Sequence, residues 1–485
     1  MALEHPDREA YVDGDARLTF AAWDRAADGV AARLEDLGVG RGDIVCVVLP
    51  SSIDYAITYQ AAMRLGAITS GVNPLLGPRE VRSILARTTP RVTVVDPLVA
   101  HVPEEAPVGT VLDRAALREA VSVGGAAGRR PELSETDPVA IVWTSGTTGA
   151  PKGAVFDHGC LKAMVTGAGA LSRPGDRRLS PLPFAHVGYM TRPWDELVHV
   201  ITTVIVPTPW TEAETLRLIG SESVTVGQGV PAQWARVLAH PALASTDLSS
   251  LRVAGTGAAR VPAELVREMR DKLGCPVVVR YTSTEASVST GTRLGDPDDV
   301  VANTVGRVAD GVELRLVGDD GIEVTVGEVG EVTIRSRATT RGYWNDPERT
   351  AEVIDAAGWV HTGDLGTLDA AGNLSLVGRR TEMYIRGGYN VYPAEVEAAL
   401  GEHPGVARVA VVGVADDALG QVGGAAIVPA DRASPPSPTD LRAWCLARLA
   451  KYKMPDLLLA VDELPLTSMS KVDKQAVAAL FGRGL

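Results

Sequence analysis

An apolar run that leads directly into a glycine- and hydroxyl-rich loop is the feature that most constrains the fold of this chain. Residues 139–143 (Val-Ala-Ile-Val-Trp) are typical of a buried strand. The loop that follows, residues 144–154, contains three glycines, four Ser or Thr hydroxyls and one lysine. Glycines let backbone N–H groups approach an anion closely, and the hydroxyls and the lysine add donors and positive charge. The pattern therefore predicts a strand followed by a loop that binds a polyphosphate.

The position of the lysine separates this loop from the Walker phosphate loop, in which Gly-Lys is followed by Ser or Thr. Here Lys152 follows Pro151 and precedes Gly153. A flexible Gly/Ser/Thr linker is the alternative interpretation. A linker rarely places Pro-Lys-Gly directly behind its flexible part, so a phosphate loop of another kind is the better prediction.

Alternating strand and helix patterns surround the loop and predict an α/β fold. An apolar strand pattern and an amphipathic helix pattern take turns along the first 230 residues, which favours two parallel, doubly wound sheets. The expected helices are residues 18–38, 52–65, 78–86 and 211–219, and the expected strands are 44–49, 67–72, 91–95, 198–206 and 224–226.

The pattern changes towards the C-terminus. Short alternating strands between residues 312 and 342 predict a small β-barrel-like subdomain. Beyond residue 379, two strands (407–414 and 423–429) and a helix (441–449) predict a smaller α+β lid domain on a hinge. We expect an N-terminal domain over residues 1–379 and a C-terminal mobile domain over 380–485.

Charge and composition exclude several classes of partner. The formal net charge of −13 argues against a nucleic acid or an anionic membrane surface as the main partner, but not against ATP in a locally basic loop. The four cysteines are scattered without a Cys-x-x-Cys pair, which favours reduced thiols. The N-terminus lacks the features of a signal peptide, and no apolar run reaches the length of a membrane span. We therefore expect a cytoplasmic protein.

The phosphate loop resembles the signature loop of the adenylate-forming superfamily, which contains acyl-CoA synthetases, adenylation domains and luciferases. The resemblance implies that the loop binds the phosphates of ATP, with Thr147, Thr148 and Lys152 on the departing phosphates. The residues implied in cofactor binding here are Thr144, Ser145, Gly146, Thr147, Thr148, Gly149 and Lys152.

A second family motif, Tyr-Gly-x-Thr-Glu, is matched at Tyr281, Thr284 and Glu285. An aromatic face can stack on adenine, a hydroxyl can reach the α-phosphate, and a carboxylate can hold Mg²⁺. Thr282 stands where the family has Gly, beside the acyl channel, so we expect a substrate that is shorter or slimmer than a long-chain fatty acid. Gly257, Ala258 and Ala259 resemble the adenine-side segment, although Arg260 replaces the usual Pro.

The remaining family motifs lie nearer the C-terminus. The resemblance implies that Asp364 accepts the ribose hydroxyls, that Arg379 helps to hold the nucleotide and that Lys471 is the catalytic lysine of the terminal motif. Only the motif distinguishes Lys471 from its neighbour Lys474. Thr381 replaces the usual Asp or Lys at the hinge, and Ser470 replaces a usual Gly.

The acyl site is the part that the sequence defines least. His186, in the segment Leu-Pro-Phe-Ala-His-Val-Gly-Tyr, is expected to gate the acyl pocket and to belong to the catalytic set with Lys471, Glu285 and Thr284. Arg192 could pair with a second substrate carboxylate, although a surface or helix-end charge is the simpler interpretation. The pocket candidates are His186, Tyr189, Gln228 and Thr282, with Trp210 as a further one.

These motifs together imply an ATP-dependent acyl-CoA synthetase that forms an acyl-adenylate, releases pyrophosphate and passes the acyl group to CoA, with Mg²⁺ as the metal. Rotation about the hinge would exchange Lys471 for the Gly387–Gly388 face between the two steps. A stand-alone adenylating enzyme that serves an acyl or peptidyl carrier protein, or another nucleophile, is the alternative. A non-catalytic nucleotide-binding protein is the third, which the motif residues at Lys152, Glu285, Asp364, Arg379 and Lys471 disfavour.

Overall fold

The computed structural model describes residues 1–99, 102, 106–125, 128, 130–144, 151–259, 261–467 and 472–482. The chain forms two compact units, and each is considered by itself. The first contains residues 1–301, 306–314 and 334–361, and the second contains residues 302–305, 315–333 and 362–485. The predicted domain bounds of 1–379 and 380–485 stay a prediction.

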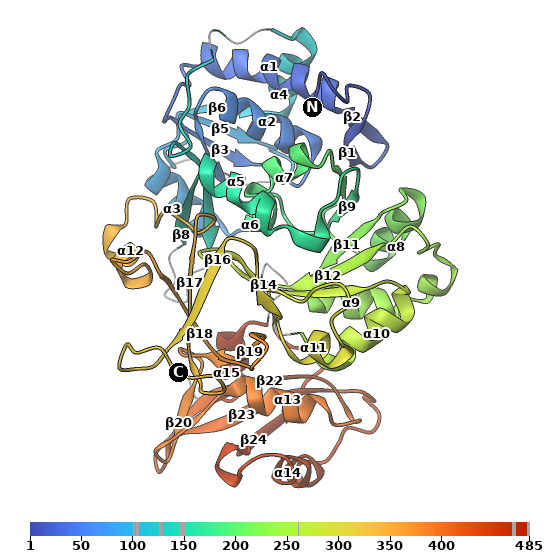
Figure 1. Ribbon diagram of the computed structural model, residues 1–485, viewed down its shortest axis with the longest axis vertical. Helices are drawn as coiled ribbons and strands as arrows, with labels where there is room; N and C mark the ends of the chain where they lie inside the picture. The colour runs from blue at the N-terminus through green and yellow to red at the C-terminus, as the bar shows by residue number, and fades with distance from the viewer. Residues whose placement is uncertain are drawn as a thin grey trace. The chain divides into compact units, whose positions relative to one another are not determined.

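A six-stranded sheet in the first unit carries the strand before the phosphate loop. Its order is β6-β5-β3-β4-β7-β8, and all its pairs are parallel except β7 with β8. Figure 1 labels β3, β5, β6 and β8 of this sheet. Only seven residues, 145–151, join β7 to β8, too few for the crossover that a parallel pair needs. The strands are β3 Ile44–Val48, β4 Ile68–Gly71, β5 Val92–Val95, β6 Thr110–Asp113, β7 Pro138–Thr144 and β8 Lys152–Asp157.

Both faces of this sheet are covered by helices, as the predicted doubly wound fold requires. Val45 and Val47 of β3 pack in a core cluster with helices α1 (Phe20–Asp36) and α2 (Ile53–Arg64), whereas Cys46 packs in another cluster with α3 (Pro78–Thr88). Successive side chains of a strand point to opposite faces, so a strand buried on both faces reads as one continuous apolar run. Side-chain hydroxyls begin two of these helices: Thr19 accepts from Ala22 N in α1, and Ser52 accepts from Tyr55 N in α2.

A nine-stranded sheet forms the rest of the first unit, in the order β15-β14-β13-β12-β11-β9-β10-β1-β2. Its centre is parallel, while β2, β14 and β15 pair antiparallel at the two edges. Both large sheets are therefore mixed at their edges, a detail that the prediction of doubly wound sheets did not include. The strands are β1 Glu9–Asp13, β2 Ala16–Thr19, β9 Arg177–Ser180, β10 Thr202–Ile205, β11 Val226–Gly229, β12 Val253–Gly257, β13 Val277–Ser283, β14 Ser287–Gly291 and β15 Arg307–Val308.

Helices connect these strands, and those predicted at residues 18–38, 52–65, 78–86 and 211–219 are present with ends that differ by a few residues. They are α1 Phe20–Asp36, α2 Ile53–Arg64, α3 Pro78–Thr88, α4 Arg114–Val123, α5 His158–Gly167, α6 Val187–Met190, α7 Pro193–Val198, α8 Glu212–Ser221, α9 Pro231–Ala239, α10 Ala263–Leu273, α11 Asp298–Asn303 and α12 Pro347–Val353. A single turn of 3₁₀ helix, Gly169–Leu171, follows α5.

The predicted barrel-like region is a four-stranded sheet in the order β16-β17-β18-β19. Its strands are β16 Val312–Val317, β17 Gly330–Ser336, β18 Val360–Leu368 and β19 Leu374–Arg379. The last two are antiparallel, and their register places Asp364 opposite Arg379.

The C-terminal part of the second unit is an α+β layer, as predicted. Strands β20 to β24 form one sheet in which β21-β20-β23-β22 are neighbours in that order and β24 pairs with β23. Its elements are β20 Tyr384–Arg386, β21 Tyr389–Val391, α13 Pro393–Gly401, β22 Val406–Asp416, β23 Gly420–Pro429, α14 Pro438–Leu446, β24 Leu457–Ala460 and α15 Lys474–Ala479. Gly387 and Gly388 both have positive φ in the two-residue turn between β20 and β21, a geometry that glycine adopts without strain.

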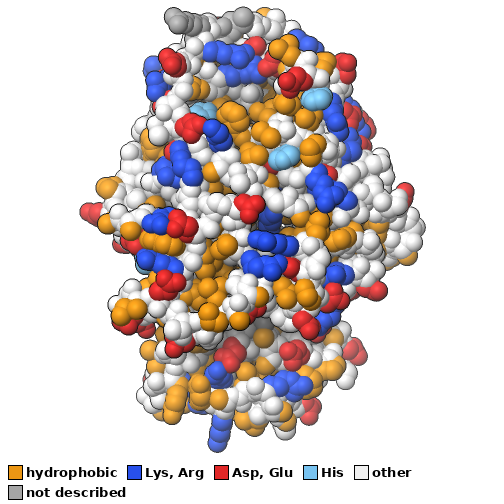
Figure 2. All heavy atoms as spheres, in the orientation of Figure 1, with side chains coloured by type: hydrophobic (Ala, Val, Ile, Leu, Met, Phe, Trp, Pro, Cys, Tyr) orange, Lys and Arg blue, Asp and Glu red, His pale blue; other side chains and the backbone are white. Residues whose placement is uncertain are grey.

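The surface carries charges of both signs. In Figure 2, basic and acidic side chains are interspersed over the face that is drawn. Within the described residues, no helix combines the length and the apolar character that crossing a membrane requires.

Candidate active site

The phosphate-loop region is described at its two ends. Thr144 is the last residue of β7 and Lys152 the first of β8, and the two are paired in the antiparallel register. The Thr144 hydroxyl lies 3.5 Å from the carbonyl oxygen of Lys152. The predicted phosphate ligands Ser145, Gly146, Thr147, Thr148 and Gly149 lie outside the described residues. Their roles stay predictions.

Tyr343 joins two of the predicted nucleotide residues. Its hydroxyl donates a 2.8 Å hydrogen bond to Oε1 of Glu285, and the Lys152 ammonium lies 5.3 Å from the centre of its ring. Tyr343 is buried, and burial together with the charge of Glu285 raises the pKa of its phenol, so the phenol keeps its proton and remains the donor. A loop lysine and a carboxylate, 133 residues apart in the chain, thus share one aromatic side chain.

Backbone hydrogen bonds fix this arrangement. The amide of Thr340 donates to the carbonyl of Glu285 at 2.9 Å, and the amide of Trp344 donates to the carbonyl of Gly153 at 2.7 Å. Tyr343 itself bridges to Ala154 as an isolated antiparallel pair. The sequence pattern alone assigned Tyr343 no role.

The adenine-side segment ends strand β12. A Cβ at Gly257 would lie 2.2 Å from the carbonyl oxygen of Arg280, so only glycine fits against β13 there. Ala258 has φ +61°, a left-handed conformation that is rare outside glycine and is found where a chain must turn sharply. Ala259 follows within the same turn, and Tyr281 is buried on the neighbouring strand. Arg260 lies outside the described residues.

The β13–β14 turn presents the residues predicted for phosphate and metal. The register shifts between Tyr281 and Thr282, and Thr282 faces Val288 of β14. Thr284 and Glu285 are half-buried in the turn that follows. Among the described residues there is no group of three His, Cys, Asp or Glu side chains that could hold a metal ion.

The predicted acyl-pocket residues other than Trp210 lie either at helix α6 or on strands of the nine-stranded sheet. His186 caps helix α6, where its Nδ1 accepts from the amide of Gly188 at 3.2 Å. Tyr189 is buried and stacks on Phe184, with 3.5 Å between ring centroids, and its hydroxyl is 3.0 Å from that of Tyr11. Gln228 and Thr282 are half-buried on β11 and β13. Trp210 lies on the loop before α8, where the Arg236 guanidinium lies 5.0 Å from its ring. Their roles in substrate binding stay predictions.

The predicted ribose residues are brought together in the second unit. Arg379 donates from Nε to Oδ1 of Asp364 at 2.8 Å across the β18–β19 pair. The Asp364 side chain is 9% exposed and that of Arg379 is 52% exposed, so the arginine reaches outward from a nearly buried carboxylate. Thr381 follows in an exposed turn after β19.

Lys471 lies outside the described residues together with Ser470, but both flanks of their loop are described. Leu466 and Val472 form an antiparallel bridge, and the amide of Asp473 donates to the carbonyl of Pro465 at 2.9 Å. Lys474 pairs with Glu397 of α13 and donates to the carbonyl of Val411 at 2.9 Å. Lys474 therefore holds α15 on the C-terminal sheet. This structural role distinguishes Lys474 from Lys471. The sequence could distinguish the two lysines only by the family motif.

Two family models and many named relatives match this chain. The family model described as AMP-binding enzyme matches residues 1–344, and that of the AMP-binding enzyme C-terminal domain matches residues 395–471. Indoleacetate–CoA ligase of Aromatoleum aromaticum is 34% identical over 500 residues, which cover 99% of this chain and 95% of that protein.

Two solved structures share the fold over almost the whole length. ATP-bound MatB from Rhodopseudomonas palustris is 27% identical with a TM-score of 0.90, covering 98% of this chain and 96% of that one. The amide bond synthetase McbA from Marinactinospora thermotolerans is 29% identical with a TM-score of 0.89, covering 98% and 97%. The predicted resemblance and the α/β fold are confirmed, and the chain belongs to the AMP-binding enzyme family of adenylate-forming enzymes.

Proposed function

We propose that this protein is an AMP-forming acid–thiol ligase, which activates a carboxylic acid with ATP and transfers the acyl group to CoA. Membership of the AMP-binding enzyme family supports the first step, and relatives named as CoA ligases support the second. The observation that carries the proposal is the joining of Lys152 and Glu285 by Tyr343, which sets a cation and a carboxylate beside the end of the phosphate-loop strand.

The chemistry needs positioning more than covalent help. A carboxylate is a poor acyl donor, and attachment of AMP gives it a good leaving group. In-line attack on the α-phosphate requires alignment and neutralisation of charge. Lys152, with Thr147 and Thr148, holds the departing phosphates, and Thr284 binds the α-phosphate. Lys471 neutralises the charge where the attacking carboxylate meets that phosphate.

Adenine and ribose are assigned to separate sets of residues. Gly257, Ala258, Ala259 and Tyr281 accommodate adenine, while Asp364 accepts the ribose hydroxyls and Arg379 orients that carboxylate. A Mg²⁺ ion would enter with ATP and bind Glu285. One carboxylate plus substrate phosphates is the usual donor set for Mg²⁺, and the bound ion neutralises phosphate charge.

The acyl site is assigned to His186, Tyr189, Gln228 and Thr282. Since Thr282 brings a β-branched side chain where the family has glycine, we place the substrate among acids that are shorter or slimmer than a long-chain fatty acid.

A second candidate keeps the adenylation and changes the acceptor. The named amide bond synthetase among the structural neighbours, at 29% identity, favours an amine or another nucleophile as one alternative to CoA, and a carrier-protein phosphopantetheine is the other. Both alternatives use the same adenylating residues.

ATP–pyrophosphate exchange over a panel of short-chain, branched, aromatic and amino acids tests the first step. We expect exchange with at least one class of acid. Repeating the productive acids with CoA, with a holo carrier protein and with simple amines then identifies the acceptor, and we expect thioester formation with CoA. Absence of exchange with every acid would overturn the proposal.

A further inference from the structure

Arg178 and Arg280 share one face of the nine-stranded sheet, and a third arginine, Arg192, stands at the start of α7. Arg178 of β9 pairs with Val226 of β11, which pairs with Val253 of β12. Gly257, four residues beyond Val253 on the same strand, pairs with Arg280 of β13. Since side chains two or four residues apart point to the same face of a sheet, Arg178 and Arg280 lie on one face. Arg192, immediately before α7, acts electrostatically on Arg280, as Arg178 does on both.

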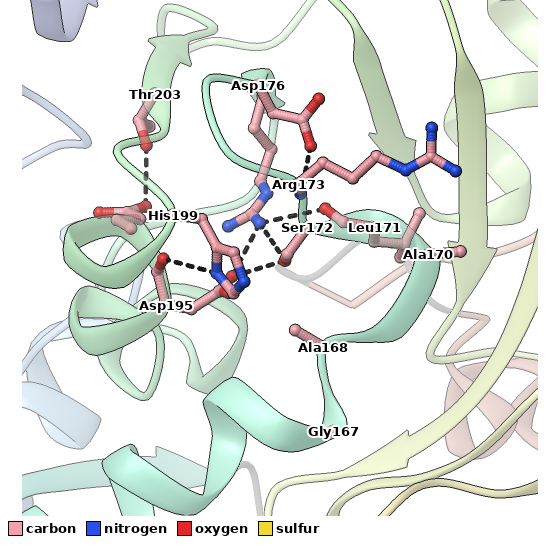
Figure 3. Close-up of polar contacts among 12 residues, drawn as sticks. Gly167, Ala168, Ala170, Leu171, Ser172, Arg173, Asp176, Asp195, His199 and Thr203 are labelled. Atoms are coloured by element: carbon pink, nitrogen blue, oxygen red, sulfur yellow. Dashed lines mark hydrogen bonds and ion pairs between the residues drawn. The ribbon is translucent and has the colours of Figure 1, made fainter.

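Part of this arginine set anchors the end of α5. Arg280 donates from Nη1 to the carbonyl of Gly167 at 2.9 Å and from Nη2 to the carbonyl of Ala168. Arg178 donates from Nη2 to the carbonyl of Leu171 at 3.1 Å and to the Ser172 hydroxyl at 2.6 Å. In Figure 3, dashed lines lead to Leu171 and Ser172, the two residues that accept from Arg178 here. These bonds use only some of the guanidinium donors.

The remaining donors are buried without a protein partner. Nε and Nη1 of Arg178, Nη1 of Arg192 and Nε of Arg280 have no hydrogen-bond partner among the described residues. Buried N–H groups of charged side chains are normally satisfied, and each one that is not needs an explanation. Four such donors on three neighbouring arginines indicate a missing acceptor.

The charges of the cluster do not balance either. The only carboxylates that act on Arg192 and Arg280, within the described part of the chain, are Asp195 and Glu196. Both are already engaged. Asp195 accepts from Arg178 at 2.7 Å and lies 2.9 Å from Nδ1 of His199 (Figure 3), while Glu196 accepts from the Tyr11 and Thr203 hydroxyls. The three guanidinium groups carry three positive charges and the two carboxylates carry two negative ones. The cluster therefore has a net charge of +1 when His199 is neutral.

Mutual repulsion of the arginines follows from this excess. Burial, with the charges of Arg192 and Arg178, lowers the pKa of Arg280 to about 9, and burial with Arg178 lowers that of Arg192 to about 10. Both values remain above neutrality, so the groups keep their charges at pH 7. An anion placed among them would relieve the repulsion.

The cluster borders the predicted acyl site. Thr282 lies two residues beyond Arg280 on β13, and Gln228 lies two residues beyond Val226 on β11, so both point to the face that carries the arginines. Arg192 donates its amide to the carbonyl of Tyr189 at 2.8 Å, which ties it to the helix of the other pocket candidates.

We propose that Arg178, Arg192 and Arg280 form an oxyanion site at the far end of the acyl pocket, which receives the second carboxylate of a dicarboxylic acid substrate. The inference rests on the proposed function, because it assigns the substrate class of the same site. A carboxylate offers two oxygens with four acceptor positions, which matches the four unpartnered donors and supplies the missing negative charge.

ATP–pyrophosphate exchange with pairs of straight-chain acids tests this assignment. Each pair has a monocarboxylic acid and the dicarboxylic acid of equal carbon number, from four to twelve carbons. We expect a higher kcat/KM for the diacid in at least one pair. The variant Arg192→Met should lose about 10- to 100-fold in kcat/KM for that diacid, the value of a charge-assisted hydrogen bond, and change the monoacid by less than twofold. Arg192→Lys should recover part of the loss.

Arg173→Met is the matched control, because Arg173 is exposed on the loop that precedes β9. It should behave as the unmodified protein with both acids. Thermal unfolding of each variant with and without the diacid, in the absence of ATP, gives a second measurement that does not depend on turnover: the diacid should raise the unfolding temperature of the unmodified protein and not that of Arg192→Met.

The outcomes distinguish a failure of the oxyanion site from a failure of the proposed ligase function. Exchange with monoacids and no preference for any diacid would overturn the oxyanion site and leave the ligase proposal intact. Equal losses of Arg192→Met on both members of a pair would also overturn it, since a structural defect does not distinguish them. No exchange with any acid would overturn the proposed function itself.

Discussion

The hydroxyl of Tyr343 donates a 2.8 Å hydrogen bond to the carboxylate of Glu285, and the ring of the same tyrosine lies under the ammonium of Lys152. A single buried side chain thereby sets the positions of both the proposed metal ligand and the proposed phosphate ligand. Hydrogen bonds to a metal-binding carboxylate orient it and tune its affinity, so this tyrosine acts on the reaction through its neighbours.

Removal of the hydroxyl alone should therefore weaken the use of MgATP. We expect Tyr343→Phe to raise the Mg²⁺ concentration for half-maximal ATP–pyrophosphate exchange about tenfold, with little change in the KM of the acid. Tyr343→Leu should lose the ring contact with Lys152 as well and raise the KM of ATP. Tyr384→Phe is the control, because its buried hydroxyl has no partner among the described residues. An unchanged Mg²⁺ dependence in Tyr343→Phe would contradict the assignment.

The two lysines near the C-terminus should give opposite defects. Lys471→Ala should lower the rate of adenylation roughly 100- to 1000-fold, as expected for loss of a charge that stabilises the transition state, with little effect on folding. Thioester formation from a supplied acyl-adenylate should suffer less. Equal losses in both half-reactions would refute the catalytic role of Lys471.

Lys474→Met should instead act on stability. It removes the ammonium that pairs with the Glu397 carboxylate, whose side chain is 13% exposed, and should lower the free energy of unfolding of the second unit by about 1 to 2 kcal/mol. Urea denaturation followed by circular dichroism measures the effect. A stable Lys474→Met protein with a lost adenylation step would show that the two lysines have been assigned the wrong way round.

The sequence predicted the sheets well because their strands are buried on both faces, and Val45 and Cys46 read as one apolar run whichever helix they contact. It could not predict contacts that depend on the packed fold. The hydrogen bond from Tyr343 to Glu285 joins residues 58 apart, and nothing in either local pattern indicates the other. The antiparallel pairing of β8 with β7 follows from the short connection between them. The length of that connection can be read from the sequence, but the phosphate-binding pattern of the loop was used to predict its function and not the direction of β8.

The arginine cluster shows the same limit more sharply. Arg178 and Arg280 stand in strands, where a basic residue suggests an exposed position. Their burial depends on the packing of α5 and α7 against the sheet. Only the folded structure shows that three guanidinium groups lie near two carboxylates.

The ion pair between Arg252 and the buried Asp176 should make the free energy of unfolding depend on pH. Burial raises the pKa of Asp176, but hydrogen bonds from Arg252 and Thr225 lower it by more, so the folded pKa is below its ordinary value. Such a carboxylate stabilises the fold above the unfolded pKa of about 4, and the contribution is lost as pH falls through the folded value.

We expect Arg252→Met to be less stable than the unmodified protein by about 3 kcal/mol at pH 7, the typical cost of leaving a buried charge unpaired. The difference should shrink as the pH is lowered below about 4, because protonation removes the charge of Asp176 in both proteins. Urea unfolding at a series of pH values measures it. A difference that is independent of pH would show that Arg252 stabilises the fold through packing and not through its charge.

Thr282 offers a test of the size of the acyl site. Its side chain points to the face of the sheet that carries Arg280 and Gln228, at the position where the family has glycine. Thr282→Gly should extend the accepted acids by about two carbons or by a wider ring, because removal of three heavy atoms opens a volume of that order, and should lower kcat/KM for the best natural length. Thr290→Ser, a buried threonine on the neighbouring strand β14, controls for general loosening of the sheet. If Thr282→Gly kept the chain-length profile of the unmodified protein, the pocket would have to lie elsewhere on this face, and the oxyanion site would have to be reached without passing Thr282.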